Sequence, residues 1–233
     1  MENLLKTPYY FLKNIQYNQQ TFQIMKSVIN VHSNCIDVGC HKGRFFDKMI
    51  ALAPSGTHWG FEPLPNLYEQ LKIRYPNPKH VVLPYALSDS EGQSIFKYVK
   101  NSPGYSGFRK RSYHIPFPEI IDIQVTKIKL DTVIDSKTKI DFIKIDVEGA
   151  ELEVLAGAEK TIKRNKPFIL FEHGIGAASY YGTKPEDIFN FFLNCKMKIY
   201  TLKSWLHNKP DLNKTGFVKQ FHKEINYYFL ACS

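Results

Sequence analysis

Several features that would place this chain in a specialised class of protein are missing from its sequence. No apolar run approaches the roughly 20 residues needed to span a bilayer. The N-terminus, MENLLKTPYYFLKN, lacks the apolar block and small-residue cleavage site of a signal peptide. We therefore expect a cytoplasmic protein without a transmembrane segment.

Cysteine is scarce, with four residues among 233, and none of them forms a Cys-x-x-Cys pair. No His and Cys spacing is typical of a structural zinc site, so we predict no metal centre of that kind. We interpret Cys35, Cys40, Cys195 and Cys232 as reduced thiols. A Cys35–Cys40 disulfide is the alternative, because both residues flank the end of a predicted strand.

Acidic residues are outnumbered: 22 Asp and Glu stand against 31 Lys and Arg, which gives a formal charge of +9. No acid lies between Glu91 and Glu119, and that interval holds the densest basic cluster: Lys97, Lys100, Arg109, Lys110 and Arg111. The simplest interpretation is a solvated face. The alternatives are a surface that holds an anionic substrate and a path for nucleic acid.

Short apolar runs alternate with segments of helical periodicity along most of the chain. Strands are predicted at 34–39, 57–61, 81–87, 140–145, 167–171, 197–202 and 226–231, and helices at 22–29, 42–52, 65–75, 151–164 and 185–194. This alternation predicts one α/β domain over 1–233 with a doubly wound, mostly parallel sheet. Residues 1–33 form a helical lead-in, and 94–125 form an inserted hairpin with a long loop that we assign to the substrate. The last two strands have little helix between them, so we expect the last to be antiparallel.

The first chemical motif is Asp37-Val-Gly39-Cys-His-Lys-Gly43, where the first strand turns into a helix. In a doubly wound sheet this turn faces the cofactor crevice. Gly39 permits a tight turn, and Gly43 is expected to let the helix start approach a ligand closely. A carboxylate at Asp37 suits a cationic ammonium or sulfonium group, and the Gly-x-Gly-x-x-Gly fingerprint of dinucleotide-binding oxidoreductases is missing. A generic strand-to-helix turn is the alternative.

Acidic residues also follow the later strands. Glu62 ends the second strand, where a carboxylate can accept hydrogen bonds from both ribose hydroxyls of an adenosine. Asp146 and Glu148 follow the central strand, and we expect Lys144 to share a face with Asp146 and to pair with it. Glu172 and His173 end the next strand and are candidates for a general base or for orienting a hydroxyl.

Taken in order, the motifs IDVGCHKG, GFEP, ALSD, KLDTVI, FIKIDVEGAELEVLAGA and PFILFEH resemble the FkbM-type methyltransferases. The resemblance implies a class I methyltransferase fold, with a seven-stranded sheet whose last strand is antiparallel. It implies S-adenosylmethionine as cofactor and methylation of hydroxyl groups on sugars, polyketides and related small molecules.

The resemblance also assigns residues to parts of the cofactor. Asp37, Gly39 and Gly43 would hold the methionine part, Glu62 with Pro63 the ribose, and Ala86, Leu87 and Ser88 the adenine, with Asp146 and Glu148 beside the transferred methyl. Cys40 and His41 stand near the methionine part, where many relatives have Ala and Asn, so contacts there are expected to differ.

Our hypothesis for the reaction makes Asp146 the first candidate base and His173 the second, with Glu172 and Glu148 orienting the acceptor or the base. The expected acceptor is a hydroxyl of a small molecule or a glycan. An anionic acceptor molecule is one alternative. Mg²⁺ is an alternative participant that the residues do not favour. The rival functions are a nucleic-acid methyltransferase, a non-catalytic adenosyl-binding module and an oxidoreductase.

Overall fold

A seven-stranded sheet forms the centre of the computed structural model, which describes residues 2–113 and 115–233. The strand order is β3-β2-β1-β7-β8-β10-β9, and β10 runs antiparallel to both of its neighbours. This confirms the predicted class I methyltransferase sheet. The strands are β1 (Cys35–Val38), β2 (His58–Phe61), β3 (His80–Leu83), β7 (Phe142–Ile145), β8 (Phe168–Glu172), β9 (Lys198–Thr201) and β10 (Tyr228–Cys232).

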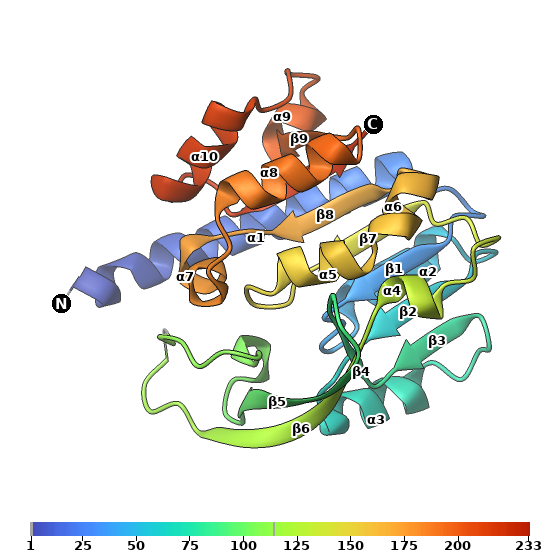
Figure 1. Cartoon of the computed structure of the whole chain (residues 1–233), viewed down its shortest axis with the longest axis horizontal. Helices are drawn as coiled ribbons and strands as arrows, with labels where there is room; N and C mark the ends of the chain where they lie inside the picture. Colours follow the sequence, from blue (N-terminus) through green and yellow to red (C-terminus); the bar gives the residue numbers. More distant parts are fainter. Residues whose placement is uncertain (1, 114) are drawn as a thin grey trace.

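Helices cover both faces of this sheet because its central strands are apolar on both sides. Cys35 and Phe142 pack in a cluster with α1 (Glu2–Val28), α2 (Arg44–Leu52) and α9 (Leu202–Leu206). Their neighbours Ile36 and Ile143 pack on the other face, against α5 (Glu151–Gly157), α6 (Glu159–Asn165), α8 (Pro185–Asn194) and α10 (Lys214–His222). Figure 1 shows α5, α6 and α8 in front of the sheet, with α1 and α2 behind it.

Two predictions about helices were wrong in detail. The expected helix over 151–164 is interrupted at Ala158, between α5 and α6. Gly157, just before the interruption, lies so close to Ser88 that an added Cβ would be 2.0 Å from the Ser88 carbonyl oxygen. The two late strands are separated by α9 and α10, which were not predicted from the sequence. Both helices begin with a capping residue. The Thr201 side chain accepts a hydrogen bond from the Ser204 amide, and the Asn213 side chain accepts one from the Gly216 amide.

The segment after β3 builds a second, three-stranded sheet. Pro84 divides the strand predicted over 81–87 into β3 and β4 (Tyr85–Leu87), and β4 joins β6 (Ile120–Ile128) and β5 (Gly92–Val99) in the order β4-β6-β5. Strands β5 and β6 form the antiparallel hairpin, and its long loop carries the 3₁₀ turn η1 (Pro103–Tyr105). The remaining short elements are α3 (Pro65–Arg74), α4 (Leu130–Val133), α7 (Ile175–Ala178) and the 3₁₀ turn η2 (Ser179–Tyr181).

All four cysteines are buried free thiols, which agrees with the expectation of reduced cysteines. Among the described residues, no helix combines the length and the apolar character that a bilayer span needs.

Candidate functional site

A cavity lies at the carboxyl ends of β1, β2 and β7, between the main sheet and the β5–β6 loop. Its empty volume, which includes open solvent at the mouth, is about 580 Å³. Eight of the predicted site residues line it: Gly39, His41, Glu62, Pro63, Ala86, Leu87, Asp146 and Glu148. Pro103, Ser106 and Phe108 of the β5–β6 loop line it from the other side.

The turn after β1 is shaped by two glycines in the left-handed region. Gly39 has φ +75°, and a Cβ there would lie 2.0 Å from the carbonyl oxygen of Asp146. Gly43 has φ +77°, but its Cβ would meet the hydroxyl of Tyr75 at 2.4 Å. Gly39 therefore brings the β1 turn against the end of β7, whereas the space at Gly43 is taken by Tyr75 of the protein itself.

Glu62 lines the cavity and is held in place by two backbone amides. Its Oε2 accepts a hydrogen bond of 2.7 Å from the amide of His41, and its Oε1 accepts one of 3.0 Å from the amide of Leu64. Burial raises the pKa of Glu62 to about 7, although both amide hydrogen bonds favour its charged form. The carboxylate thus has a fixed orientation, with lone pairs left for a ligand.

Lys144 lies between two carboxylates, and it confirms the pairing expected with Asp146. Its Nζ is 3.3 Å from Asp146 Oδ2 and 3.5 Å from Asp37 Oδ1, and its side chain is 3% exposed. Asp37 is also buried, and burial raises its pKa against the opposing effect of Lys144. Asp37 was expected to hold the methionine part of a cofactor. In the structure it pairs with Lys144 instead, and it is not among the residues that line the cavity.

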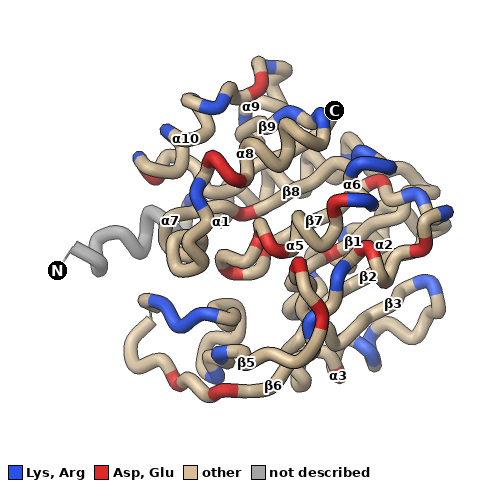
Figure 2. Tube along the Cα trace, viewed as in Figure 1, with Lys and Arg blue, Asp and Glu red and all other residues tan. Residues whose placement is uncertain are grey.

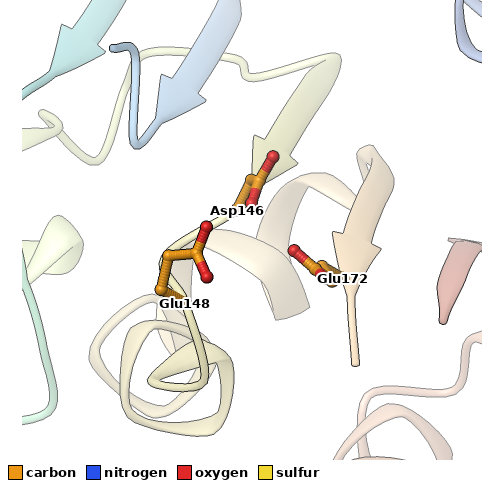
Figure 3. A group of neighbouring side chains, drawn as sticks. All are labelled: Asp146, Glu148 and Glu172. Atoms are coloured by element: carbon orange, nitrogen blue, oxygen red, sulfur yellow. The ribbon is translucent and has the colours of Figure 1, made fainter. Parts of the chain in front are cut away.

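Three carboxyl groups converge beside the cavity. Oxygens of Asp146, Glu148 and Glu172 lie within 4.8 Å of one another, and Figure 3 shows the three side chains pointing toward a common centre. Three acids at this spacing have the ligand chemistry of a divalent-cation site. One oxygen of Glu148 is already paired with the guanidinium of Arg111.

The three carboxyl groups differ in their affinity for a proton. Burial opposes ionisation of Asp146, but Lys144 and hydrogen bonds from Glu172 and Tyr228 outweigh it and leave its pKa below the ordinary value. Burial, with the charge of Asp146, raises the pKa of Glu172 far above its ordinary value. Burial also raises the pKa of Glu148 to about 8 despite Arg111. Asp146 is thus the one of the three whose pKa is lowered, and its side chain is 29% exposed and lines the cavity.

Glu151 serves the local backbone. Its carboxylate accepts hydrogen bonds of 3.0 Å from the Gly149 amide and 3.4 Å from the Val147 amide. Glu148, in the same turn, has φ +60°. The acid at the start of α5 thus stabilises the turn that presents Asp146 and Glu148.

Other predicted residues lie apart from the carboxyl cluster. His173 is fully buried, and its ring stacks on Phe221 and Phe217 at centroid distances of 4.8 and 6.0 Å. Burial lowers the pKa of His173 to about 4. Ser88 is buried and donates a hydrogen bond of 2.9 Å to Glu153, and Cys40 is buried behind the β1 turn.

Two residues of the site were missed from the sequence. Tyr228 of β10 donates a hydrogen bond of 3.0 Å to Asp146, and no motif marks it. Arg111 lies in the basic cluster, but nothing in the sequence predicts its pairing with Glu148. Its guanidinium lies 5.3 and 5.8 Å from the ring centroids of Tyr105 and Tyr113.

Comparison with known proteins decides the family. The model of the methyltransferase FkbM domain matches residues 37–199, more than half of the chain. The chain belongs to the methyltransferase FkbM family. This confirms the resemblance drawn from the motifs and places the chain among the methyltransferases.

One solved structure supports this fold for an FkbM chain, and two others are similar to it at lower TM-scores. A methyltransferase FkbM from Methylobacillus flagellatus KT is 16% identical, with a TM-score of 0.54, and the match covers 88% of this chain but only 44% of that longer protein. A putative rRNA-methylase from Clostridium thermocellum is 11% identical, with 92% of each chain covered and a TM-score of 0.49. A precorrin-6y C5,15-methyltransferase from Geobacter metallireducens GS-15 is 9% identical, with 78% of this chain and 71% of that chain covered and a TM-score of 0.43. A search of curated protein sequences finds no significant match.

Proposed function

We propose that this FkbM-family chain transfers a methyl group from S-adenosylmethionine to a hydroxyl of a sugar, a glycan or a small metabolite. The observation that carries the proposal is that Asp146, ion-paired with Lys144, lines the same cavity as the fixed carboxylate of Glu62. One acid is suited to a ribose, and the other to a proton transfer beside a cationic sulfonium.

The residues around the cavity fit the cofactor. Glu62 and Pro63 would hold the ribose, Ala86 and Leu87 would flank the adenine, and Gly39 and His41 would lie along the methionine part. Glu62 is positioned by backbone amides alone, so its free lone pairs face the cavity without a competing side chain. When bound, S-adenosylmethionine supplies an electrophilic methyl group on a positively charged sulfur.

Asp146 is suited to accept the proton of the acceptor hydroxyl. A hydroxyl is a poor nucleophile until its proton is removed, and a positioned base typically contributes about 10²–10⁴-fold. Lys144 keeps Asp146 ionised, and Tyr228 fixes one of its oxygens. Glu172, whose pKa is raised by burial and by the charge of Asp146, shares a hydrogen bond with Asp146 at the end of β8.

The test is a screen for methyl transfer with cofactor that carries a labelled methyl group. Purified protein is incubated with that cofactor and a panel of sugars, uronic acids, hydroxy acids and oligonucleotides, and products are read by mass spectrometry. We expect an ether-linked methyl on a hydroxyl compound. Label found only on a nucleobase would replace this proposal with a nucleic-acid methyltransferase.

A further inference from the structure

A second depression adjoins the cavity, and its charge is opposite to that of the carboxyl cluster. It is lined by Gln93, Ser94, Ile95, Lys97, Phe108, Arg109, Gln124, Lys127 and Glu153, and we refer to it as the basic groove. Phe108 lines both the basic groove and the cavity. A molecule that occupied both, with its reacting end beside Asp146, would pass along Phe108 to reach the basic groove.

Two cations of the basic groove have no acidic partner among the described residues. Arg109 is exposed and forms no side-chain hydrogen bond or ion pair in this part of the chain. Lys127 donates a hydrogen bond of 2.7 Å to the hydroxyl of Ser90, and its Nζ lies 6.0 Å from the ring centroid of Phe108. Lys97 is neutralised by Asp122 on the neighbouring strand.

The basic part of the β5–β6 segment lies opposite the acidic start of α5. In Figure 2 the segment between β5 and β6 carries a continuous basic stretch, while acidic positions collect at the start of α5 opposite it. The single acid that lines the basic groove, Glu153, accepts a hydrogen bond from Ser88 and is held away by it. The groove thus offers positive charge to a bound molecule, and the cavity offers negative charge.

The neutral lining residues favour hydroxyl groups. Gln93, Gln124 and Ser94 supply amide and hydroxyl groups that can both donate and accept hydrogen bonds, as sugar hydroxyls require. We propose that the basic groove binds a carboxylate- or phosphate-bearing sugar chain, so that the methyl acceptor is one hydroxyl of an anionic glycan. This inference rests on the proposed function, because it names the substrate class of that same site.

A nucleic acid fits the basic groove less well. Proteins that bind single strands without sequence preference stack successive bases on aromatic side chains. Phe108 is the one aromatic residue among those that line the groove, and it already packs edge-on against Phe96 at a centroid distance of 5.1 Å. Nothing in the lining provides a row of stacking platforms.

Fluorescence anisotropy with labelled probes tests the inference without turnover. The probes are a hexameric galacturonate, a phosphorylated maltohexaose, neutral maltohexaose and hexauridylate. The proteins are the wild type, the double variant Arg109→Gln/Lys127→Gln, and the control Lys137→Gln/Lys203→Gln, which removes the same charge from exposed positions elsewhere. Calorimetry with S-adenosylhomocysteine is run on each protein.

We expect salt-sensitive binding of the galacturonate, the phosphorylated maltohexaose or both, weakened at least about tenfold in the groove variant and less than about twofold in the control. The relative affinity of these two probes identifies the anionic group. Equal weakening in both variants, no binding of either anionic sugar, or preferred binding of hexauridylate would each overturn the inference. Calorimetry separates the two proposals. If the wild type does not bind S-adenosylhomocysteine, the proposed methyltransferase function is contradicted, whatever the sugar probes show.

Discussion

Tyr228 and Asp146 are 82 residues apart in sequence, yet the tyrosine hydroxyl donates a hydrogen bond of 3.0 Å to Asp146 Oδ2. The antiparallel pairing of β10 with β8 produces this contact, because it places Tyr228 directly opposite Glu172. The last strand therefore does more than close the sheet. It brings a buried donor to the carboxyl cluster, where that donor stabilises the ionised form of Asp146.

Replacing Tyr228 with Phe removes this donor and keeps the ring. Because the hydrogen bond favours the charged carboxylate, its loss should raise the pKa of Asp146. The acid limb of the kcat profile should therefore move to higher pH, with activity retained at alkaline pH. The measurement is kcat against pH with the acceptor found in the labelling screen. A uniform loss at every pH would point to a purely structural role for Tyr228.

Asp146→Asn should remove the base and leave the cofactor site in place. We expect kcat to fall by about 10²–10⁴-fold, while the dissociation constant of S-adenosylhomocysteine stays within a few-fold. Asp211→Asn, at an exposed acid that pairs with Lys198, is the matched control and should behave as the wild type. Near-normal turnover by Asp146→Asn would rule out Asp146 as the base.

Gly39 and Gly182 allow the cost of close approach to be separated from backbone strain. Both have positive φ, +75° and +70°, but a Cβ would clash with Asp146 only at Gly39 and would meet nothing within 4 Å at Gly182. Both alanine variants should therefore lose some stability through strain. Gly39→Ala should lose about 1–3 kcal/mol more, in the range typical of overpacking. Urea unfolding measures the difference, and equal losses would show that the β1 turn relaxes freely.

His173 should make stability depend on acidity. Burial holds its folded pKa at about 4, below its ordinary value of 6.5. The unfolded chain therefore binds a proton that the folded chain does not, so stability falls as pH drops from 6.5 toward 4, by up to about 3 kcal/mol. His173→Leu should flatten this dependence and retain methyl transfer at neutral pH. An unchanged slope would show that His173 is not the group that causes this dependence, and loss of turnover in a stable variant would support His173 as a base.

The sequence predicted the parts of the fold that depend on local pattern. The buried strands β1, β2 and β7 and the acids that follow them were found because hydrophobic runs and strand-end carboxylates lie close together in sequence. The helices α9 and α10 were missed, since their caps are single polar residues in a lysine-rich segment. Tyr228 and the Arg111–Glu148 pair depend on tertiary contacts between distant segments, which one sequence does not reveal.

Calorimetric titration with S-adenosylhomocysteine at pH 8 and pH 6 measures most directly whether Glu62 belongs to an adenosyl site. The wild type should bind in a saturable manner, and more weakly at pH 6, because burial raises the pKa of Glu62 to about 7 and the protonated form accepts fewer hydrogen bonds. Glu62→Gln should weaken binding at pH 8 by at least about tenfold, equivalent to one hydrogen bond to a charged group. Absence of binding by the wild type at millimolar ligand, or equal affinity of wild type and Glu62→Gln at both pH values, would contradict the proposed cofactor site.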